Sequence, residues 1–282
     1  MKRILWKLKE RELQLGNRTL LMGVLNVAPD SFSDGGKFTD PDRAFAHAIE
    51  MEEQGADIID VGAESTHPGS SRITEAEEWQ RLAPVLKRLR GRLAAPVSVD
   101  TYKAAVAEKA LDLGVEIIND PSGLTFDPHL AKIVAERNAA LILNHMRGTP
   151  ETWAKLPPLP HPMASVVNDL QATINRALRA GLTRAQLALD PGLGFGKRKE
   201  QNFEILARLG ELVRLDLPVL VGPSRKSFLN QTTPPALEFA GAAAVTVAVL
   251  NGAHMVRVHD VAAIKPVLYV VDEIVRTRDQ GL

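Results

Sequence analysis

Short apolar runs alternate with longer amphipathic segments along nearly the whole chain. Each run leads into a polar turn, and then into a segment in which apolar residues recur with the spacing of a helix face. The runs predict strands at 20–26, 57–62, 96–100, 116–119, 140–145, 187–190, 218–221 and 255–258. The amphipathic segments predict helices at 42–54, 75–92, 102–113, 128–136, 162–180, 201–209, 235–251 and 261–276.

Glycines support this division of the chain. Gly55, Gly114, Gly181 and Gly252 each follow a predicted helix and shortly precede the next strand, as a C-cap glycine does. Strands this short and apolar, alternating with helices, indicate a parallel sheet covered by helices. The predicted fold is α/β, a single (β/α)8 TIM barrel. An open doubly wound sheet is the alternative, and it is disfavoured because no G-x-G-x-x-G motif follows the first strand.

The N-terminal residues lie outside this repeating pattern. We expect residues 1–19 to form an extension that packs on the barrel, and residues 20–282 to form the barrel domain. Residues 1–12 are charged and lack the apolar core of a signal peptide, which predicts a cytoplasmic protein. The uncharged stretch 239–256 contains Thr246, Asn251 and His254, so we interpret it as a buried helix, a turn and a strand and not as a membrane span.

Composition narrows the classes of partner. Lys and Arg total 34 and Asp and Glu total 34, so the formal net charge is zero, which argues against nucleic acid or an anionic membrane as a partner. The chain has no cysteine, which excludes disulfides, thiolate nucleophiles and cysteine-ligated metal sites. Small-molecule substrates, with any anion bound by a local cluster, fit these numbers better.

Every predicted strand ends in, or leads into, polar residues. An isolated Asn or Asp at such a place often caps a helix or forms a turn. In a closed barrel, however, the carboxyl ends of all the strands meet at one mouth, so the sequence predicts a ligand site there. The polar positions are Asn26, Glu64 to His67, Asp100, Asn119 and Asp120, Asn144 and His145, Asp190, Ser224 to Ser227, and Arg257 to Asp260.

Three of these residues are acceptors or amides with no cation beside them in sequence. Asp100, Asn119 and Asp190 would suit a flat heterocycle with an amino-pyrimidinone edge, because a carboxylate can accept two parallel N–H bonds.

The last two strands carry donors instead. Lys226, Arg257 and His259 suit an anion, and barrels often bind phosphate at this place. Asn26, on the neighbouring first strand, can add an oxygen ligand to a Mg²⁺ ion that bridges phosphates. A solvated basic rim or an ion-pair network is the alternative interpretation of these cations.

Two loops are rich in Gly, Ser and Asp and would not pack a core. They span 28–36 and 65–72, and they carry Phe32 and Pro68, which can stack on a ligand or line its pocket. Active-site lids have this composition, although plain surface loops remain an alternative.

Eight motifs occur in an order that is specific to one family. They are GVLNVAPDSFSDGG at 23–36, ESTHPG at 64–69, SVDT at 98–101, IND at 118–120, HMRGTP at 145–150, LDPGLGFG at 189–196, SRKSF at 224–228 and RVHD at 257–260. On these motifs the chain resembles the dihydropteroate synthase family of folate biosynthesis over about residues 20–274.

The resemblance implies a transferase that joins 6-hydroxymethyl-7,8-dihydropterin diphosphate to 4-aminobenzoate and releases pyrophosphate. It also implies Mg²⁺ as cofactor and a homodimer. By position in the motifs, it assigns the pterin to Asp100, Asn119, Asp190 and Lys226, the diphosphate to Asn26, Thr66, Arg257 and His259, and the aminobenzoate to Phe32, Thr66, Pro68 and Ser227. It assigns catalysis to Asp100, Lys226, Arg257 and His259, and the metal to Asn26.

Electrostatics favours a reaction in which the leaving group departs first. An aniline nitrogen is a weak nucleophile, so an SN1-like route would release diphosphate and leave a cation delocalised into the pterin ring. Arg257, His259 and Mg²⁺ would stabilise the departing charge, and Asp100 would lie near the positive ring.

The chain departs from the family pattern at four positions. It has His67 where Arg is usual, Asn144 where Met is usual, Ala28 where Thr is usual and Pro121 where a β-branched residue is usual. Histidine is only partly charged near neutral pH, so Arg72 is a candidate to replace the missing cation.

Three other functions compete with this interpretation. A degenerate homologue would bind pterin without turnover. A methyltransferase that uses methylated folate would share the Asp and Asn pattern, but it has no diphosphate to bind. A zinc hydrolase would need histidines at metal spacing, and His254 and His259 do not form such a pair.

Overall fold

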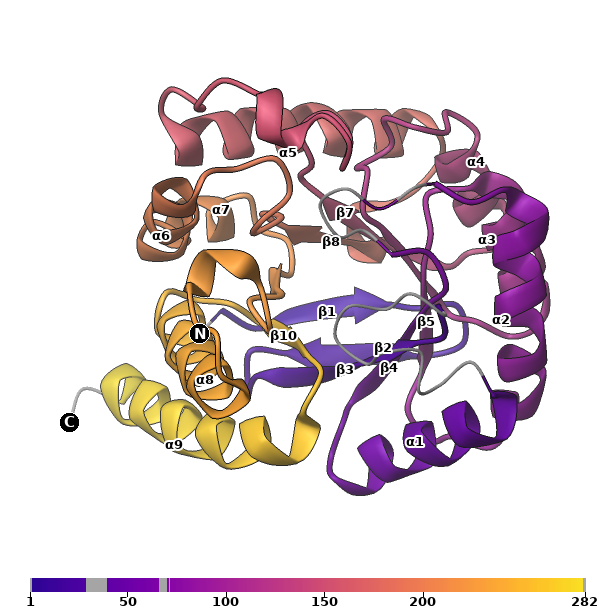
Figure 1. The fold of residues 1–282 in the computed structure, drawn as a ribbon, viewed down its shortest axis with the longest axis horizontal. Coiled ribbons are helices and arrows are strands. Elements are labelled where there is room, and N and C mark those ends of the chain that lie inside the picture. Colours follow the sequence, from indigo (N-terminus) through magenta and orange to yellow (C-terminus); the bar gives the residue numbers. More distant parts are fainter. Residues whose placement is uncertain (1, 29–39, 66–69, 71, 281–282) are drawn as a thin grey trace.

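The computed structural model describes residues 2–28, 40–65, 70 and 72–280. In this part of the chain, eight parallel strands form a barrel and helices surround it (Figure 1). The strands are β3 (Leu20–Asn26), β4 (Ile58–Gly62), β5 (Val97–Asp100), β6 (Ile117–Asp120), β7 (Ala140–Asn144), β8 (Leu187–Asp190), β9 (Leu220–Val221) and β10 (Met255–Val258). They are ordered β8-β7-β6-β5-β4-β3-β10-β9.

The barrel closes between its first and last strands in that order. Leu189 of β8 forms a parallel bridge with Val219, and its N–H donates to the carbonyl of Pro218 over 2.8 Å. The predicted strand 218–221 is therefore present as backbone pairing, although only Leu220 and Val221 form a regular strand, because Pro218 has no N–H to donate. The predicted TIM barrel is confirmed.

Helices follow the strands in the predicted order. They are α1 (Pro41–Glu53), α2 (Glu75–Leu89), α3 (Ala104–Asp112), α4 (Leu130–Glu136), α5 (Pro162–Arg179), α6 (Lys199–Ala207), α7 (Gly210–Val213), α8 (Pro234–Leu250) and α9 (Val261–Asp279). Short 3-10 helices lie at Trp153–Lys155, Arg184–Gln186 and Ser227–Leu229. The sequence did not predict α7, which follows α6 after a break at Arg208 and Leu209.

Local sequence explains where several helices begin and end. Thr74 caps α2 in a capping box, in which its hydroxyl accepts from Glu77 N and the Glu77 carboxylate accepts from Thr74 N. Gly55 and Gly252 adopt φ values of 96° and 97°, the left-handed conformation that lets the chain turn from helix to strand. Apolar faces of the helices pack on the outward faces of the strands in one large core.

The N-terminal residues form a hairpin across the bottom of the barrel. Its strands β1 (Ile4–Lys7) and β2 (Glu12–Leu15) pair antiparallel, and the sequence did not predict them. Trp6, Leu8 and Leu15 are buried against the lower layer of inward-facing barrel residues, a second core that includes Met22. The Trp6 Nε1 atom also donates to the carbonyl of Gln186 over 3.2 Å.

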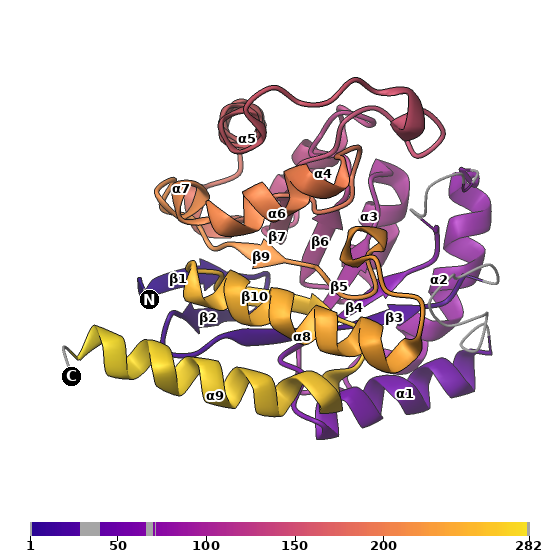
Figure 2. The same cartoon turned by 60° about the vertical axis from the view of Figure 1, so that its left-hand side comes forward.

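The uncharged stretch 239–256 forms the predicted helix, turn and strand, in α8, Gly252 and β10. Among the residues that the structure describes, no helix is both long and apolar enough to cross a membrane. Helices α8 and α9 lie side by side along one side of the barrel (Figure 2).

Candidate active site

The carboxyl ends of five strands bring the predicted polar residues to one mouth. Asn26, Asp100, Asn119 and Asp190 are each the last or second-to-last residue of β3, β5, β6 or β8, and Arg257 lies near the end of β10. Asn119 and Asp190 are buried, with relative exposures of 6% and 8%. The structure therefore places the predicted acceptors and a predicted donor in one cluster.

Arg257 connects two carboxylates in this cluster. Its Nη2 donates to Asp100 Oδ2 over 2.9 Å, and its Nε donates to Asp60 Oδ2 over 2.7 Å. Burial works against the charge of Arg257, but Asp60 and Asp100 outweigh it and raise the pKa of the guanidinium above its ordinary value. The sequence assigned Arg257 and Asp100 to different ligands, whereas the structure joins them in one ion pair.

Asp60 is a member of the site that the sequence analysis missed. It lies in the middle of β4 and is fully buried, with Ile59 and Val61 as its neighbours. The available signal was a single carboxylate inside an apolar strand run, because a buried charge requires partners.

Asp100 has an unusual acid–base property. Burial raises its pKa to about 7, with Arg257 opposing the rise and Asp60 adding to it. This carboxyl therefore titrates near neutral pH.

Lys226 lies against an aromatic ring in the same mouth. Its Nζ is 4.1 Å from the ring centroid of Phe195, a cation–π contact. Burial and the charge of Arg257 lower the pKa of Lys226 to about 8, against the opposing effect of Asp190 and Asp100. Asp190 is itself buried, which raises its pKa, while a bond from Gly192 N and the charge of Lys226 oppose the rise.

The loop after β8 positions Phe195, and its lysine was also missed by sequence reasoning. Lys197 Nζ donates to the carbonyls of His145 over 2.9 Å, Gly192 over 2.6 Å and Phe195 over 3.3 Å. Burial holds the pKa of Lys197 well below its ordinary value. A lysine directly after a glycine-rich loop was the available signal, but its carbonyl partners depend on the loop's folded path.

His259 is paired with a serine on the neighbouring strand end. Its Nδ1 lies 2.9 Å from Ser224 Oγ, and its backbone N–H donates to the same oxygen over 3.3 Å. Burial, together with Arg225, Arg257 and Lys226, holds the pKa of His259 well below its ordinary value, so the ring is neutral at neutral pH.

The residues around Asn26 would suit a metal that takes further ligands from a bound phosphate group. Asn26 and Asp100 lie beside Gly62, where an added Cβ would be 3.5 Å from Asp100 Cβ, 3.7 Å from Asn26 Oδ1 and 3.9 Å from Asp100 Oδ2. Within the described ranges, no group of three or more His, Asp or Glu could hold a metal alone. A single amide oxygen, with no cluster of carboxylates around it, would suit a Mg²⁺ ion that takes its other ligands from phosphate and water.

The remaining predicted contacts divide into two groups. Ser227 is exposed at the start of a 3-10 helix, beside Lys226. Phe32, Thr66 and Pro68, assigned to the aminobenzoate or the diphosphate, lie outside the described residues, as does His67.

The departure at Asn144 has a structural explanation. Its Nδ2 donates to the carbonyl of Pro121 over 2.6 Å, and the residue is buried. The amide therefore links the ends of β6 and β7 through this hydrogen bond.

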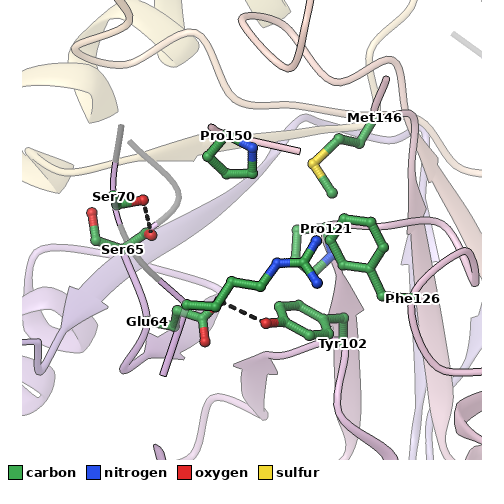
Figure 3. Close-up of a pocket in the computed structure, with 9 residues that line it drawn as sticks. Glu64, Ser65, Ser70, Tyr102, Pro121, Phe126, Met146 and Pro150 are labelled. Atoms are coloured by element: carbon green, nitrogen blue, oxygen red, sulfur yellow. Dashed lines mark hydrogen bonds between the residues drawn. The ribbon is translucent and has the colours of Figure 1, made fainter. Parts of the chain in front are cut away.

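A small hollow lies beside the mouth, between the segments that follow β4, β5, β6 and β7 (Figure 3). The Arg72 guanidinium lies over the Phe126 ring, 4.1 Å from its centroid, and 5.7 Å from that of Tyr102. The Tyr102 hydroxyl donates to Glu64 over 2.9 Å. Arg72 therefore contacts aromatic rings in this structure, and its predicted replacement of an arginine at position 67 stays a prediction.

Comparison with known proteins agrees with this fold and identifies its family. The family model described as pterin binding enzyme matches residues 22–259. A dihydropteroate synthase of Synechocystis is 42% identical over 265 residues, which cover 93% of this chain and 92% of that protein. The solved Yersinia pestis dihydropteroate synthase, in complex with a sulfonamide drug, is 37% identical with a TM-score of 0.92, covering 98% of this chain and 100% of that chain.

A third relative was solved with 4-aminobenzoic acid. The Xanthomonas albilineans dihydropteroate synthase with 4-aminobenzoic acid is 37% identical with a TM-score of 0.88, covering 97% of this chain and 98% of that chain. The barrel is thus that of a pterin-binding enzyme. Within that class, the chain belongs to the dihydropteroate synthase family, whose members are transferases.

Proposed function

We propose that the protein is a cytoplasmic enzyme that condenses 6-hydroxymethyl-7,8-dihydropterin diphosphate with 4-aminobenzoate to form 7,8-dihydropteroate and pyrophosphate. The observation that carries the proposal is the meeting of acceptors and donors in one mouth. Asn119 and Asp190 can bind the edge of a heterocycle, while Arg257 and Lys226 lie within the same cluster. The 4-aminobenzoic acid in the Xanthomonas relative supports the second substrate.

The buried acceptors would hold the pterin. Asp190 can accept two parallel N–H bonds from an amino-pyrimidinone edge, and its burial makes each bond stronger than in water. Lys226, whose Nζ lies over the Phe195 ring, would donate a hydrogen bond to an acceptor atom of the pterin. The exposed Ser227 and the predicted contacts Phe32, Thr66 and Pro68 would shape the aminobenzoate site.

The chemistry would begin with departure of the leaving group. The bond between the pterin methylene carbon and the diphosphate oxygen breaks, and its electron pair leaves with pyrophosphate. The resulting cation is delocalised into the ring near Asp100. The aniline nitrogen then forms the new C–N bond, and its extra proton passes to water.

Arg257 and His259 would stabilise the departing charge. The neutral His259 ring can accept from the Ser224 hydroxyl at Nδ1, which leaves Nε2–H to donate to a diphosphate oxygen. When bound, Mg²⁺ would neutralise negative charge on the diphosphate, with Asn26 as its protein ligand. Asn26 and Thr66 would complete the diphosphate contacts.

We also propose a homodimer, formed through α8 and α9. Phe239 on α8 is 77% exposed, and Tyr269 on α9 is 71% exposed. Val247 on α8 and Val270 and Ile274 on α9 are also exposed, and the two helices pack against each other. Light scattering should give twice the chain mass, and Val270→Glu should shift it to the single-chain mass.

Product analysis tests the function. The protein is mixed with both substrates and Mg²⁺, and dihydropteroate is separated by chromatography. Product formation supports the proposal. Tight binding of the pterin without product would instead support the degenerate homologue. Methyl transfer from a methylated folate would support the methyltransferase.

The leaving-group-first route has its own test. Pterin diphosphate labelled with ¹⁸O at the bridging oxygen is incubated with enzyme and Mg²⁺ in the absence of aminobenzoate. Movement of the label to non-bridging positions supports the route, because the bond has broken and re-formed. A label that stays in place during incubation with active enzyme argues for direct displacement.

A further inference from the structure

Asp60 occupies a costly position for a carboxylate. It lies in the middle of β4, has no solvent exposure and is flanked by Ile59 and Val61. A charge in such a place destabilises the fold unless partners compensate for the lost hydration. The partners of Asp60 therefore indicate what it does.

One oxygen of Asp60 joins two site residues from distant parts of the chain. Oδ2 accepts from Arg257 Nε over 2.7 Å and from Asn119 Nδ2 over 3.1 Å. Through Arg257 the contact extends to Asp100, 2.9 Å from Nη2. Asp60 thus connects β4 with β6 and β10, and indirectly with β5.

The contact with Asn119 fixes which way round the amide lies. A carboxylate oxygen only accepts hydrogen bonds, so the NH₂ group of Asn119 must face Asp60. The amide oxygen and the second N–H of Asn119 then remain for other partners. A ligand must therefore present an N–H to the amide oxygen of Asn119. If the amide were reversed, its oxygen would instead face the carboxylate oxygen of Asp60.

The contact with Arg257 fixes the plane of the guanidinium. Nε is bound by Asp60 and Nη2 by Asp100, so both ends of the planar group are held. The other oxygen of Asp60, Oδ1, is buried and has no hydrogen-bond partner in the described structure. Such an atom is costly to leave unpaired, so the position of this carboxylate is not explained by stability alone.

We propose, on the basis of the function proposed above, that Asp60 is a positioning residue of the pterin site, which sets the orientation of the Asn119 amide and of the Arg257 guanidinium. Its substitution should therefore affect the pterin and leave the aminobenzoate contacts unchanged.

Calorimetry with 6-hydroxymethyl-7,8-dihydropterin diphosphate, in the presence of Mg²⁺ and without aminobenzoate, tests this role. Asp60→Asn keeps the side-chain volume but no longer dictates the direction of the Asn119 amide. We expect its Kd for the pterin diphosphate to rise about ten- to a hundredfold, the loss typical of hydrogen bonds to a charged group. The KM for 4-aminobenzoate should not change.

Asp57→Asn is the matched control. Asp57 precedes the same strand at the bottom of the barrel and also pairs with an arginine, Arg18, at 2.5 Å and 2.7 Å. The Asp57→Asn substitution should lower the melting temperature and leave the Kd for the pterin diphosphate unchanged. The positioning role would be overturned if Asp60→Asn bound the pterin diphosphate as wild type does. It would also be overturned if the KM values for the pterin diphosphate and for 4-aminobenzoate rose equally. Wild-type protein that does not bind the pterin diphosphate would instead overturn the proposed function.

NMR of the wild-type protein tests the role if Asp60→Asn does not fold. The side-chain amide of Asn119, assigned by its loss in Asn119→Ser, should show one proton that is protected from solvent exchange. Two protons that both exchange as fast as those of an exposed amide would contradict the contact with Asp60.

Discussion

Nη2 of Arg257 lies 2.9 Å from Oδ2 of Asp100, and this ion pair joins the proposed diphosphate contact to the proposed pterin contact. The same guanidinium binds Asp60 at its other edge. A ligand that enters the mouth therefore meets an arginine that is already oriented, which is the arrangement that stabilises developing charge most effectively.

Removal of this arginine should affect turnover more than binding of the second substrate. We expect Arg257→Ala to lower kcat by about 10²–10³, the usual loss for one preorganised donor at a site of developing charge. The Kd for 4-aminobenzoate, measured with pyrophosphate present, should stay close to that of wild type. Comparable losses in kcat and in aminobenzoate affinity would sink the leaving-group role of Arg257.

The rate should depend on pH within a narrow range. As pH rises through about 7, Asp100 ionises and can stabilise a cationic ring, so kcat/KM for the pterin should increase. As pH rises through about 8, Lys226 loses its proton and kcat/KM should fall. A pH–rate profile with both substrates checks both limbs.

Lys226→Arg is the control for the alkaline limb. Arginine stays charged over this range, so the remaining activity should no longer fall above pH of about 8. An alkaline limb that persists unchanged in this variant would show that another group causes it.

The hairpin at the bottom of the barrel should contribute strongly to stability. Trp6 is fully buried and Leu5, its neighbour, is 48% exposed. We expect Trp6→Ala to lower the free energy of unfolding by about 3–5 kcal/mol, because it leaves a cavity. Leu5→Ala should cost less than about 0.5 kcal/mol, as is usual for exposed positions. Urea unfolding curves measure both, and equal losses would show that the hairpin does not share the barrel core.

The loop after β8 should not tolerate a side chain at its first glycine. Gly192 has φ of 66°, and a Cβ there would lie 2.0 Å from the carbonyl oxygen of His145. Gly114 has φ of 99°, but a Cβ there would meet nothing within 4 Å. Gly114→Ala should therefore cost about 1–2 kcal/mol from backbone strain alone.

Gly192→Ala should cost about 4 kcal/mol or more, because backbone must move as well. It should also lower activity, since the loop holds Phe195 against Lys226. Thermal unfolding and kcat of the two variants are the measurements. If Gly192→Ala were as stable and active as Gly114→Ala, the close approach to His145 would not be important.

The parts of the fold that the sequence predicted are those governed by local pattern. β3 matches its predicted range at both ends, because an apolar run is followed at once by a polar residue. The hairpin was missed because each strand has four residues and only Trp6 of β1 is buried, too short a pattern to signal pairing. The break between α6 and α7 likewise depends on packing, since both segments have helical composition.

The site divides in the same way. Asp100, Asn119 and Asp190 could be predicted because they end strands, and the barrel brings strand ends together. Asp60 could not be assigned a role, because Asn119 is 59 positions away and Arg257 is 197 positions away in sequence. The contacts of Lys197 with backbone carbonyls depend on the conformation of the loop, which its glycines make possible. The pattern of side chains in the sequence does not predict this conformation.

Pyrophosphate release tests the central claim most directly. Wild-type protein is mixed with the pterin diphosphate, 4-aminobenzoate and Mg²⁺, and pyrophosphate and dihydropteroate are measured together, with Asp190→Asn and the surface variant Asp279→Asn in parallel. We predict equal amounts of the two products from wild type and from Asp279→Asn, and a rate lower by about 10² or more for Asp190→Asn. Wild-type protein that binds the pterin but releases no pyrophosphate, or an Asp190→Asn variant that is fully active, would contradict the account.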